Sequence, residues 1–305
     1  MTYEQALGHI IKDRRESLGA TQTDLCRGIC SISTLSRAEG GEYSDSRTIS
    51  IMLDKLGLSD STLTELTRDP DYAVRQKIRE ANQADCLGEK AKARAIMDEL
   101  SCDYDDFSLT NKQRYDTLDT LLMYDDGIID DKTRLKNLEK CLRMTLNNYS
   151  SSSPLPKVLT RSERDLLEHI ANSYYYLNNR PKAIEILYQV KEYVEAKILD
   201  KLDAAEDLSF TCYNLSKFLG LEGRYDECID VARRGIYCSR YSSQLDYYAR
   251  CMYNCAWSMA RRNEGSDREE AKALAEKALA LASVEELNLQ SLKGHIENFL
   301  KEFYG

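Results

Sequence analysis

The first sixty residues contain four short stretches in which apolar residues recur at helical spacing. In the first stretch the residues at helical spacing are Ile10, Ile11 and Leu18, with Leu7 a turn earlier. In the fourth stretch they are Ile49, Met52, Leu53 and Leu56, which lie on one stripe. The pattern predicts helices over about 3–18, 22–27, 32–39 and 46–56. The short lengths and close spacing of these stretches indicate a small helical domain.

Turn and capping residues separate these predicted helices. Thr21 and Asp24 have the spacing of a capping box, and Gly28 permits a sharp turn before a helix that opens at Ser31 or Ile32. Two short helices joined by a tight glycine-containing turn are typical of a helix-turn-helix. In that motif the second of the two helices enters the major groove of DNA.

The predicted DNA-reading helix has one basic residue. Arg37 can pair with guanine or with phosphate, and Gln22 can reach a phosphate from the preceding helix. The alternative is that these helices only cap the domain that follows them. The candidate DNA-contacting residues are Gln22, Ser31, Ile32, Ser33, Thr34, Ser36 and Arg37.

Composition supports helices and limits the functional classes. The chain of 305 residues is 30% charged and contains only 4 Pro and 14 Gly, which leaves little room for turn-dense β structure. No apolar window approaches a membrane span, and the N-terminus lacks the features of a signal peptide, so we expect a cytoplasmic protein without membrane contact. The formal net charge is −9, and residues 1–60 carry seven basic and nine acidic residues. DNA binding must therefore depend on local geometry, because a basic footprint is missing.

The ten cysteines do not form a recognisable chemical site. No CxxC occurs, and the three histidines lie far from any cysteine pair in sequence. Reduced cysteines acting as small core residues are the favoured interpretation. We find no metal-ligand spacing, phosphate loop or catalytic triad order, and so predict no metal, no cofactor and no enzymatic activity.

Beyond Pro70, small residues recur in a fixed frame with spacings of seven and five. The three sets are Ala81, Gly88 and Ala93, then Ala171, Asn178 and Ala183, then Ser216, Gly223 and Cys228. Ala256 and Ala271 match the frame with about three residues inserted. Lys112–Asn147 is predicted to form a divergent repeat, and Glu286–Phe303 a terminal helix. This frame resembles the tetratricopeptide repeat, and the resemblance implies stacked helical hairpins whose first helices line a concave face.

The same frame selects residues for that concave face. Asn214 and Asn254 occupy one register of successive repeats, and an amide side chain can both donate to and accept from a peptide backbone. The alternative is an asparagine that packs between helices beside a core tyrosine. For Arg79, which can bind a carboxylate, a surface ion pair is the alternative. The candidate peptide-binding residues are Arg79, Asn82, Asn172, Tyr175, Tyr213, Asn214, Tyr253 and Asn254.

Two resemblances connect these patterns. The segment 21–41 resembles the helix-turn-helix of the Xre/Cro group in its sequence TQTDLCRGICSISTLSRAEGG, and residues 28–39 are similar to the version found in RRNPP peptide-sensing quorum regulators of the Rgg and PlcR kind. The small-residue frame resembles the tetratricopeptide repeat. These resemblances imply an all-α chain with a helix-turn-helix domain over 1–68 and a right-handed α-solenoid of tetratricopeptide-like hairpins over 71–305. They also imply a structural pair between Arg15 and Glu39.

The resemblances further imply a transcription regulator. It would bind a double-stranded DNA operator as a homodimer and sense a short signalling peptide in its concave groove. The alternative function is a regulator whose repeat domain is a docking platform for other proteins, without a small peptide ligand.

Overall fold

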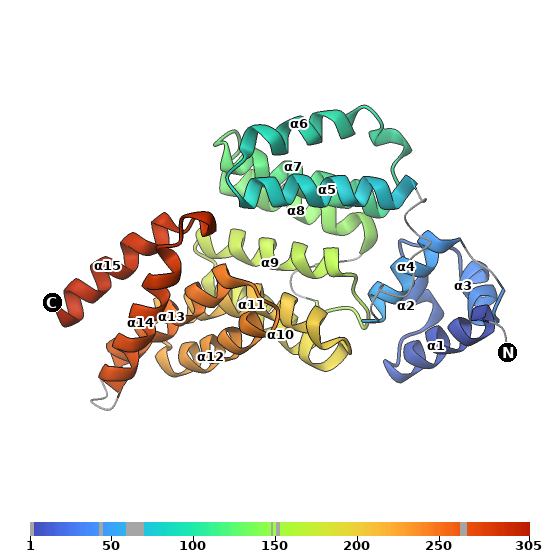
Figure 1. Ribbon diagram of the computed structural model, residues 1–305. Helices are drawn as coiled ribbons and strands as arrows, with labels where there is room; N and C mark the ends of the chain where they lie inside the picture. The colour runs from blue at the N-terminus through green and yellow to red at the C-terminus, as the bar shows by residue number, and fades with distance from the viewer. Residues whose placement is uncertain (1–2, 43–44, 59–69, 148, 151–152, 263–266) are drawn as a thin grey trace. The chain divides into compact units, whose positions relative to one another are not determined.

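A computed structural model describes residues 3–42, 45–58, 70–147, 149–150, 153–262 and 267–305, and it contains helices and no strand within these ranges (Figure 1). The chain divides into two compact units. Unit 1 comprises Met1–Ser173 and Lys197–Asp200, and unit 2 comprises Tyr174–Ala196 and Lys201–Gly305. The predicted all-α class is confirmed.

Unit 1 begins with a four-helix bundle. Its helices are α1 (Tyr3–Ser17), α2 (Gln22–Cys26), α3 (Ile32–Glu39) and α4 (Ser46–Lys55). The capping box predicted at Thr21 and Asp24 is present, and the Ser31 hydroxyl caps α3 by accepting from the amide of Thr34. The bundle closes on fully buried apolar side chains that include Ile11, Leu35 and Met52.

Helical hairpins follow in unit 1. They are formed by α5 (Pro70–Cys86) with α6 (Lys90–Ser101), and by α7 (Leu109–Asp125) with α8 (Asp131–Thr145), with the 3₁₀ turn η2 (Tyr104–Asp106) between them. α5 also packs on α7, so the first helices of the two hairpins form one layer. α7 and α8 are the divergent repeat predicted between Lys112 and Asn147.

The next helix, α9 (Arg161–Tyr176), begins in unit 1 and ends in unit 2. Unit 2 continues with α10 (Arg180–Lys197), α11 (Lys201–Leu221), α12 (Tyr225–Tyr241), α13 (Leu245–Arg262), α14 (Arg268–Ala282), the 3₁₀ turn η4 (Glu285–Leu287) and α15 (Gln290–Tyr304). Successive helices from α11 to α15 pack on one another, and α13 also packs on both α11 and α15 (Figure 1). The helices α11, α13 and α15 therefore form one layer of unit 2.

The small-residue frame explains the packing of the hairpins. Its turn positions Gly88, Asn178 and Gly223 all have a positive φ, at 80°, 64° and 76°, a conformation that glycine and asparagine tolerate best. The flanking frame residues have no exposed surface; they are Ala81, Ala93, Ala171, Ala183, Ser216, Cys228, Ala256 and Ala271. Small side chains at these positions let the two helices of a hairpin approach closely.

The cysteines are free thiols, as expected. Seven of them are buried, which fits the prediction of small core residues. Cys86 and Cys102 are exposed, so that prediction is wrong for these two, which lie at the C-terminal ends of α5 and α6 where each helix leaves the core.

Several contacts tie the four-helix bundle to the rest of unit 1. Val158 packs against the apolar core of the bundle, and the Lys157 ammonium donates to the carbonyl of Gly19 at 2.5 Å. The backbone amide of Arg161 donates to both carboxylate oxygens of Asp54 at 3.2 Å. The sequence predicts a helix-turn-helix domain over 1–68 and a repeat domain over 71–305. The boundary between these two domains lies outside the described residues, so this division stays a prediction.

The buried Lys55 belongs to the same contact region. Its side chain, 1% exposed, donates from Nζ to the carbonyl of Arg27 at 2.6 Å. Burial lowers the pKa of Lys55, and the charge of the buried Glu163 opposes that shift. A lysine at the end of α4 thus faces inward, towards the start of α9.

The segment Lys197–Asp200 also contacts the four-helix bundle. The amide of Leu199 donates to the carbonyl of Gly57 at 3.3 Å, and Arg14 donates to the carbonyls of Leu56 and Lys197. Gly57 has a φ of 66°, and a Cβ there would lie 2.8 Å from the Lys197 carbonyl oxygen. Only glycine permits this approach without a shift of backbone.

Candidate functional site

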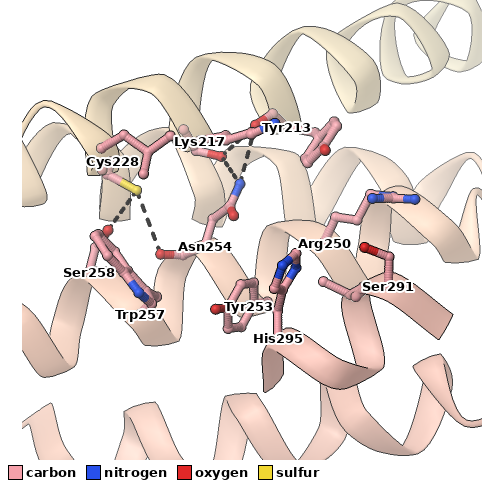
Figure 2. Close-up of a pocket in the computed structure, with 14 residues that line it drawn as sticks. Tyr213, Lys217, Cys228, Arg250, Tyr253, Asn254, Trp257, Ser258, Ser291 and His295 are labelled. Carbon is pink, nitrogen blue, oxygen red and sulfur yellow. Dashed lines mark hydrogen bonds between the residues drawn. The ribbon is translucent and has the colours of Figure 1, made fainter. Parts of the chain in front are cut away.

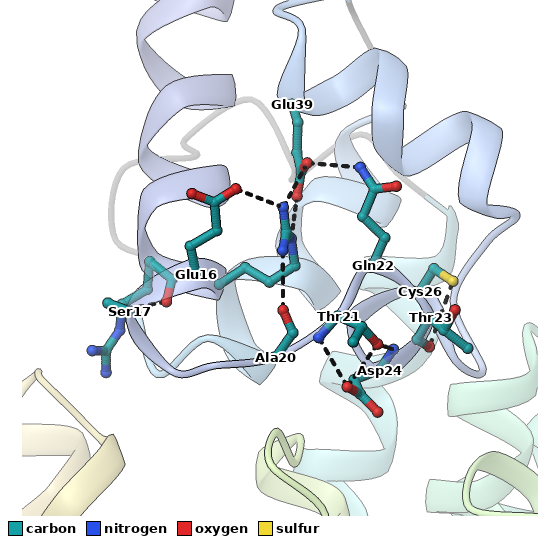
Figure 3. Close-up of polar contacts among 11 residues, drawn as sticks. Glu16, Ser17, Ala20, Thr21, Gln22, Thr23, Asp24, Cys26 and Glu39 are labelled. Atoms are coloured by element: carbon teal, nitrogen blue, oxygen red, sulfur yellow. Dashed lines mark hydrogen bonds and ion pairs between the residues drawn. The ribbon is translucent and has the colours of Figure 1, made fainter.

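A buried ion pair fixes the angle between the helices of the candidate DNA-binding motif (Figure 3). Two guanidinium nitrogens of Arg15 in α1 donate to the two carboxylate oxygens of Glu39 in α3, at 2.5 and 3.0 Å. Both residues are 7% exposed, and Arg15 also donates to the carbonyl of Ala20. Burial opposes ionisation of Glu39, but hydrogen bonds from Arg15 and Gln22 outweigh it and hold the pKa of Glu39 below its usual range. The predicted structural pair is present.

This arrangement divides α3 into two faces. Leu35, Ala38 and Glu39 are buried against the bundle. On the other face lie the exposed residues Ile32, Ser33, Ser36 and Arg37, with Thr34 partly buried at the edge. Ile32 is 49% exposed and is one of several large apolar side chains at the protein surface. Its predicted contact with DNA stays a prediction.

Hydroxyl groups gather at the start of α3. The Ser31 hydroxyl lies 2.8 Å from the hydroxyl of Ser33 and 2.9 Å from that of Thr34, while it caps the helix. All three side chains were predicted to contact DNA. In the structure the Ser31 hydroxyl bonds to the other two and caps the helix, so the predicted contacts of all three with DNA stay predictions.

Two further candidate DNA-contacting residues, Arg37 and Gln22, also have partners. Arg37 donates from Nε to Glu42 at 2.7 Å in a pair whose side chains are both 65% exposed. The Gln22 amide donates to Glu39 at 2.9 Å and so belongs to the Arg15 network. The predicted contact of Gln22 with a DNA phosphate stays a prediction. Such a contact would use the second N–H of the Gln22 amide, which the bond to Glu39 leaves unused.

Unit 2 contains a pocket of about 340 Å³ between α11, α13 and α15 (Figure 2). This volume lies at the lower end of the range for ligand pockets, about 300–1,000 Å³. Its lining residues are Tyr213, Ser216, Lys217, Gly220, Leu221, Cys228, Arg250, Tyr253, Asn254, Trp257, Ser258, Ser291, Leu292 and His295. We call this pocket the groove. It combines aromatic walls with several polar and cationic groups.

Three of the predicted peptide-binding residues meet in the groove: Tyr213, Tyr253 and Asn254. Figure 2 shows the Asn254 amide turned towards α11, where it donates to the carbonyl of Tyr213 at 3.2 Å and to the Ser216 hydroxyl at 2.9 Å. The Asn254 amide group therefore joins α11 to α13, which is the packing alternative stated above. Any contact of Asn254 with a peptide backbone would fall to its carbonyl oxygen.

Asn214 and Tyr175 belong to unit 2 but do not line the groove. Asn214 is 5% exposed, and its amide nitrogen has no hydrogen-bond partner among the described residues. Tyr175 is 7% exposed and stacks on Phe218, with ring centroids 3.8 Å apart. Tyr175 is therefore the core ring of the three consecutive tyrosines, whereas Tyr176 is 49% exposed.

Arg79, Asn82 and Asn172 all lie in unit 1. Arg79 and Asn82 are exposed on α5, and Asn172 is half-buried on α9. The groove residues belong to unit 2, so these three residues are not part of the groove. Their predicted contacts with a peptide stay predictions.

Several solved structures have a similar fold, and two of them contain a bound peptide. PlcR from Bacillus thuringiensis, in complex with the peptide PapR7 and DNA, aligns with a TM-score of 0.60 at 19% identity. The alignment covers 96% of this chain and 99% of PlcR. Its apo form aligns with a TM-score of 0.55 at 18% identity, covering 96% of this chain and 98% of the other. The competence regulator ComR from Streptococcus vestibularis, in complex with its signalling peptide XIP, covers 98% of both chains with a TM-score of 0.53 at 15% identity.

At these identities the likeness concerns the fold. It covers the four-helix bundle and the hairpins together, which agrees with the predicted order of a helix-turn-helix followed by tetratricopeptide-like repeats. No protein-family model matches the sequence, and no curated protein matches it either.

The sequence pattern missed the cationic and indole side chains of the groove. Lys217 and Trp257 each follow a frame residue directly, after Ser216 and Ala256, so the register that selected Asn82 and Asn172 would also have found them. Arg250 lies one turn before Asn254 on the same helix. His295 lies on α15, outside the repeat frame, and no sequence signal pointed to it.

The part of the chain that the structure describes contains neither a membrane-spanning helix nor a metal-binding cluster. None of its helices is long and apolar enough to cross a bilayer. Within the same residues, no group of three or more His, Cys, Asp or Glu side chains is arranged to hold a metal ion. Burial raises the pKa of the groove residue Cys228 to about 11, which leaves its thiol a poor nucleophile at neutral pH.

Proposed function

We propose that this protein is a transcription regulator that binds double-stranded DNA through α3 and senses a short peptide in the groove of unit 2. The observation that carries the DNA-binding part is the two-faced α3, whose buried side is locked by Arg15 and Glu39 while Ser33, Ser36 and Arg37 stay exposed. A helix held at a fixed angle with a polar outer face is what recognition in the major groove requires.

The groove supports the peptide-sensing part of the proposal. Tyr213, Tyr253 and Trp257 supply apolar walls, and the side chains of Lys217, Arg250 and Ser291 supply hydrogen-bond donors. Peptide pockets generally combine such walls with a few polar groups that fix orientation. PlcR and ComR, whose folds this chain shares, are both described in complex with peptides.

Regulation requires that the groove and α3 influence each other. The segment Lys197–Asp200 joins α10 to α11 in sequence, yet it contacts Gly57 and Arg14 at the end of α4 and in α1. We infer that peptide binding changes DNA binding through this segment, in a cytoplasmic homodimer on a two-fold operator. A ligand can shift such an equilibrium only by its differential affinity for the two states.

The DNA-binding part is tested by selecting sequences from a random duplex pool with the purified full-length protein. We expect a two-fold symmetric site to be enriched, and Arg37→Ala to abolish enrichment without lowering the melting temperature. Lys12→Ala is the matched control, because Lys12 is an exposed cation on α1 outside the α3 face. Enrichment retained by Arg37→Ala would exclude α3 as the reading helix.

The peptide-sensing part is tested by fluorescence. The chain contains one tryptophan, and that residue, Trp257, lines the groove. Titration with a pool of synthetic hexapeptides is expected to change its emission and to alter the affinity for the selected DNA. If the DNA affinity responds only to a protein partner, the repeat domain is a docking platform instead.

A further inference from the structure

The groove carries positive charge within an acidic chain. The sequence has 51 acidic and 42 basic residues, yet the groove lining contains Lys217 and Arg250 and, among the described residues, no Asp or Glu. Other cations of unit 2 pair with carboxylates on the surface, as Arg180 does with Glu222 and Arg234 with Glu195. The two groove cations are arranged differently.

Tyrosine rings, and not carboxylates, hold the two groove cations. The Lys217 ammonium donates to the Tyr176 hydroxyl at 3.0 Å and lies 5.6 Å from the centroid of that ring. The Arg250 guanidinium carbon lies 5.3 Å from the centroid of the Tyr213 ring. Aromatic faces attract cations but leave their charge uncancelled, so both groups remain available to an anion.

The charge states favour an incoming anion. Burial opposes the protonation of Lys217, but the neighbouring Tyr213 and Tyr176 outweigh it, and the pKa of Lys217 is raised; the charge of Arg250 acts in the opposite direction. The two cations therefore sense each other inside one pocket. An anion bound between them would relieve this repulsion as well as gain two charge-assisted hydrogen bonds.

One acidic residue on α13, Asp246, precedes Arg250 but does not line the groove. Asp246 lies one turn earlier and interacts with the charge of Arg250, yet burial raises the pKa of Asp246. Among the described residues no carboxylate oxygen lies within the 4.0 Å of an ion pair from Lys217 or Arg250.

We propose that the groove recognises a peptide by a carboxylate held between Lys217 and Arg250, with the adjoining residue of the peptide packed against Tyr253 and Trp257. This inference rests on the peptide-sensing function proposed above. The carboxylate is either the free C-terminus of the peptide or an Asp or Glu side chain, since the two present the same group to the cations.

Three synthetic hexapeptide pools separate these sources. The first pool lacks Asp and Glu and is amidated at the C-terminus, the second lacks them but has a free C-terminus, and the third is amidated and contains one Glu. The full-length protein is incubated with each pool, and retained peptides are quantified by mass spectrometry. We expect the second or the third pool to be retained at least about tenfold over the first, since hydrogen bonds to charged groups are stronger than those between neutral groups.

Matched variants assign the effect to the groove. Lys217→Met and Arg250→Met should each lower retention about tenfold and reduce the change in Trp257 emission, at an unchanged melting temperature. Lys277→Met, which removes an exposed cation on α14, should retain the wild-type pattern.

The outcomes distinguish this inference from the function on which it rests. Equal retention of the amidated neutral pool, or full retention by both methionine variants, would overturn carboxylate recognition while leaving peptide sensing intact. Retention of none of the pools would contradict peptide sensing itself, and carboxylate recognition with it.

Discussion

Arg15 and Glu39, which are 24 residues apart in sequence, form a doubly hydrogen-bonded ion pair that is almost entirely buried. Removing one partner of such a pair leaves an uncompensated charge in the protein interior. We expect Arg15→Ala and Glu39→Ala each to lower the free energy of unfolding by about 3–5 kcal/mol, measured by urea denaturation.

The exposed pair of Arg37 and Glu42 provides the control for this prediction. Its side chains are 65% exposed, and pairs of that kind contribute about 0–1 kcal/mol. Arg37→Ala should therefore leave the free energy of unfolding nearly unchanged. Equal losses in Arg15→Ala and Arg37→Ala would refute a special role for the buried pair.

Glu42 also restrains the residue expected to read DNA. Because Arg37 must exchange Glu42 for DNA, Glu42→Gln should tighten operator binding by up to about fivefold, the equivalent of a weak surface pair. Binding is measured by fluorescence anisotropy at fixed salt. Glu286→Gln, an exposed site in η4, changes the net charge equally and should have no effect. Weaker binding by Glu42→Gln would mean that the ion pair helps to position Arg37.

Gly57 offers a test of the contact between α4 and the segment Lys197–Asp200. Gly57→Ala incurs a left-handed backbone penalty of about 1 kcal/mol and also a clash with the Lys197 carbonyl. Gly127→Ala is the matched control, because Gly127 has a φ of 71° and no atom within 4 Å of its added Cβ. We expect Gly57→Ala to be the more destabilising by at least about 1 kcal/mol in thermal unfolding. Identical losses would show that the α4 contact contributes nothing.

His169 should make unit 1 sensitive to mild acid. Burial, together with the nearby charge of Arg134, lowers the pKa of His169 to about 3, whereas an unfolded histidine titrates near about 6.5. Between these values the unfolded state binds more protons, so this contribution to stability is complete above about pH 6.5 and is lost as the pH falls. His169→Gln should flatten the dependence of melting temperature on pH between 7 and 5.

The control for that prediction is His295→Gln, because His295 is exposed on α15. This variant should keep the wild-type pH dependence. A parallel shift of both variants would assign the acid sensitivity to other groups.

Much of the fold follows from local signals in the sequence. Thr21 and Asp24 form their capping box within four consecutive residues, and the turn positions Gly88 and Gly223 have the positive φ that glycine best tolerates. Short-range rules of this kind depend on a few neighbouring residues, so they can be applied without knowing the tertiary structure.

The candidate site was harder to predict because its properties depend on distant partners. The Asn254 amide group is engaged by Tyr213 and Ser216, about forty residues earlier in the chain. Likewise, Tyr175 is a core ring because Phe218 stacks on it. A repeat frame shows which residues share a register, but it does not show which of them another helix covers.

The contacts of Val158, Lys157 and Arg161 with the four-helix bundle bear on how this protein can be engineered. A chimera cut at residue 68 would separate the bundle from these partners and would leave Lys55 without its buried surroundings. The compact unit that would have to be transferred is unit 1. Unit 1 is discontinuous in sequence, because Tyr174–Ala196 of unit 2 separates Lys197–Asp200 from the rest of it. Exchange of the four-helix bundle between proteins of this architecture therefore requires grafting two separate segments at once.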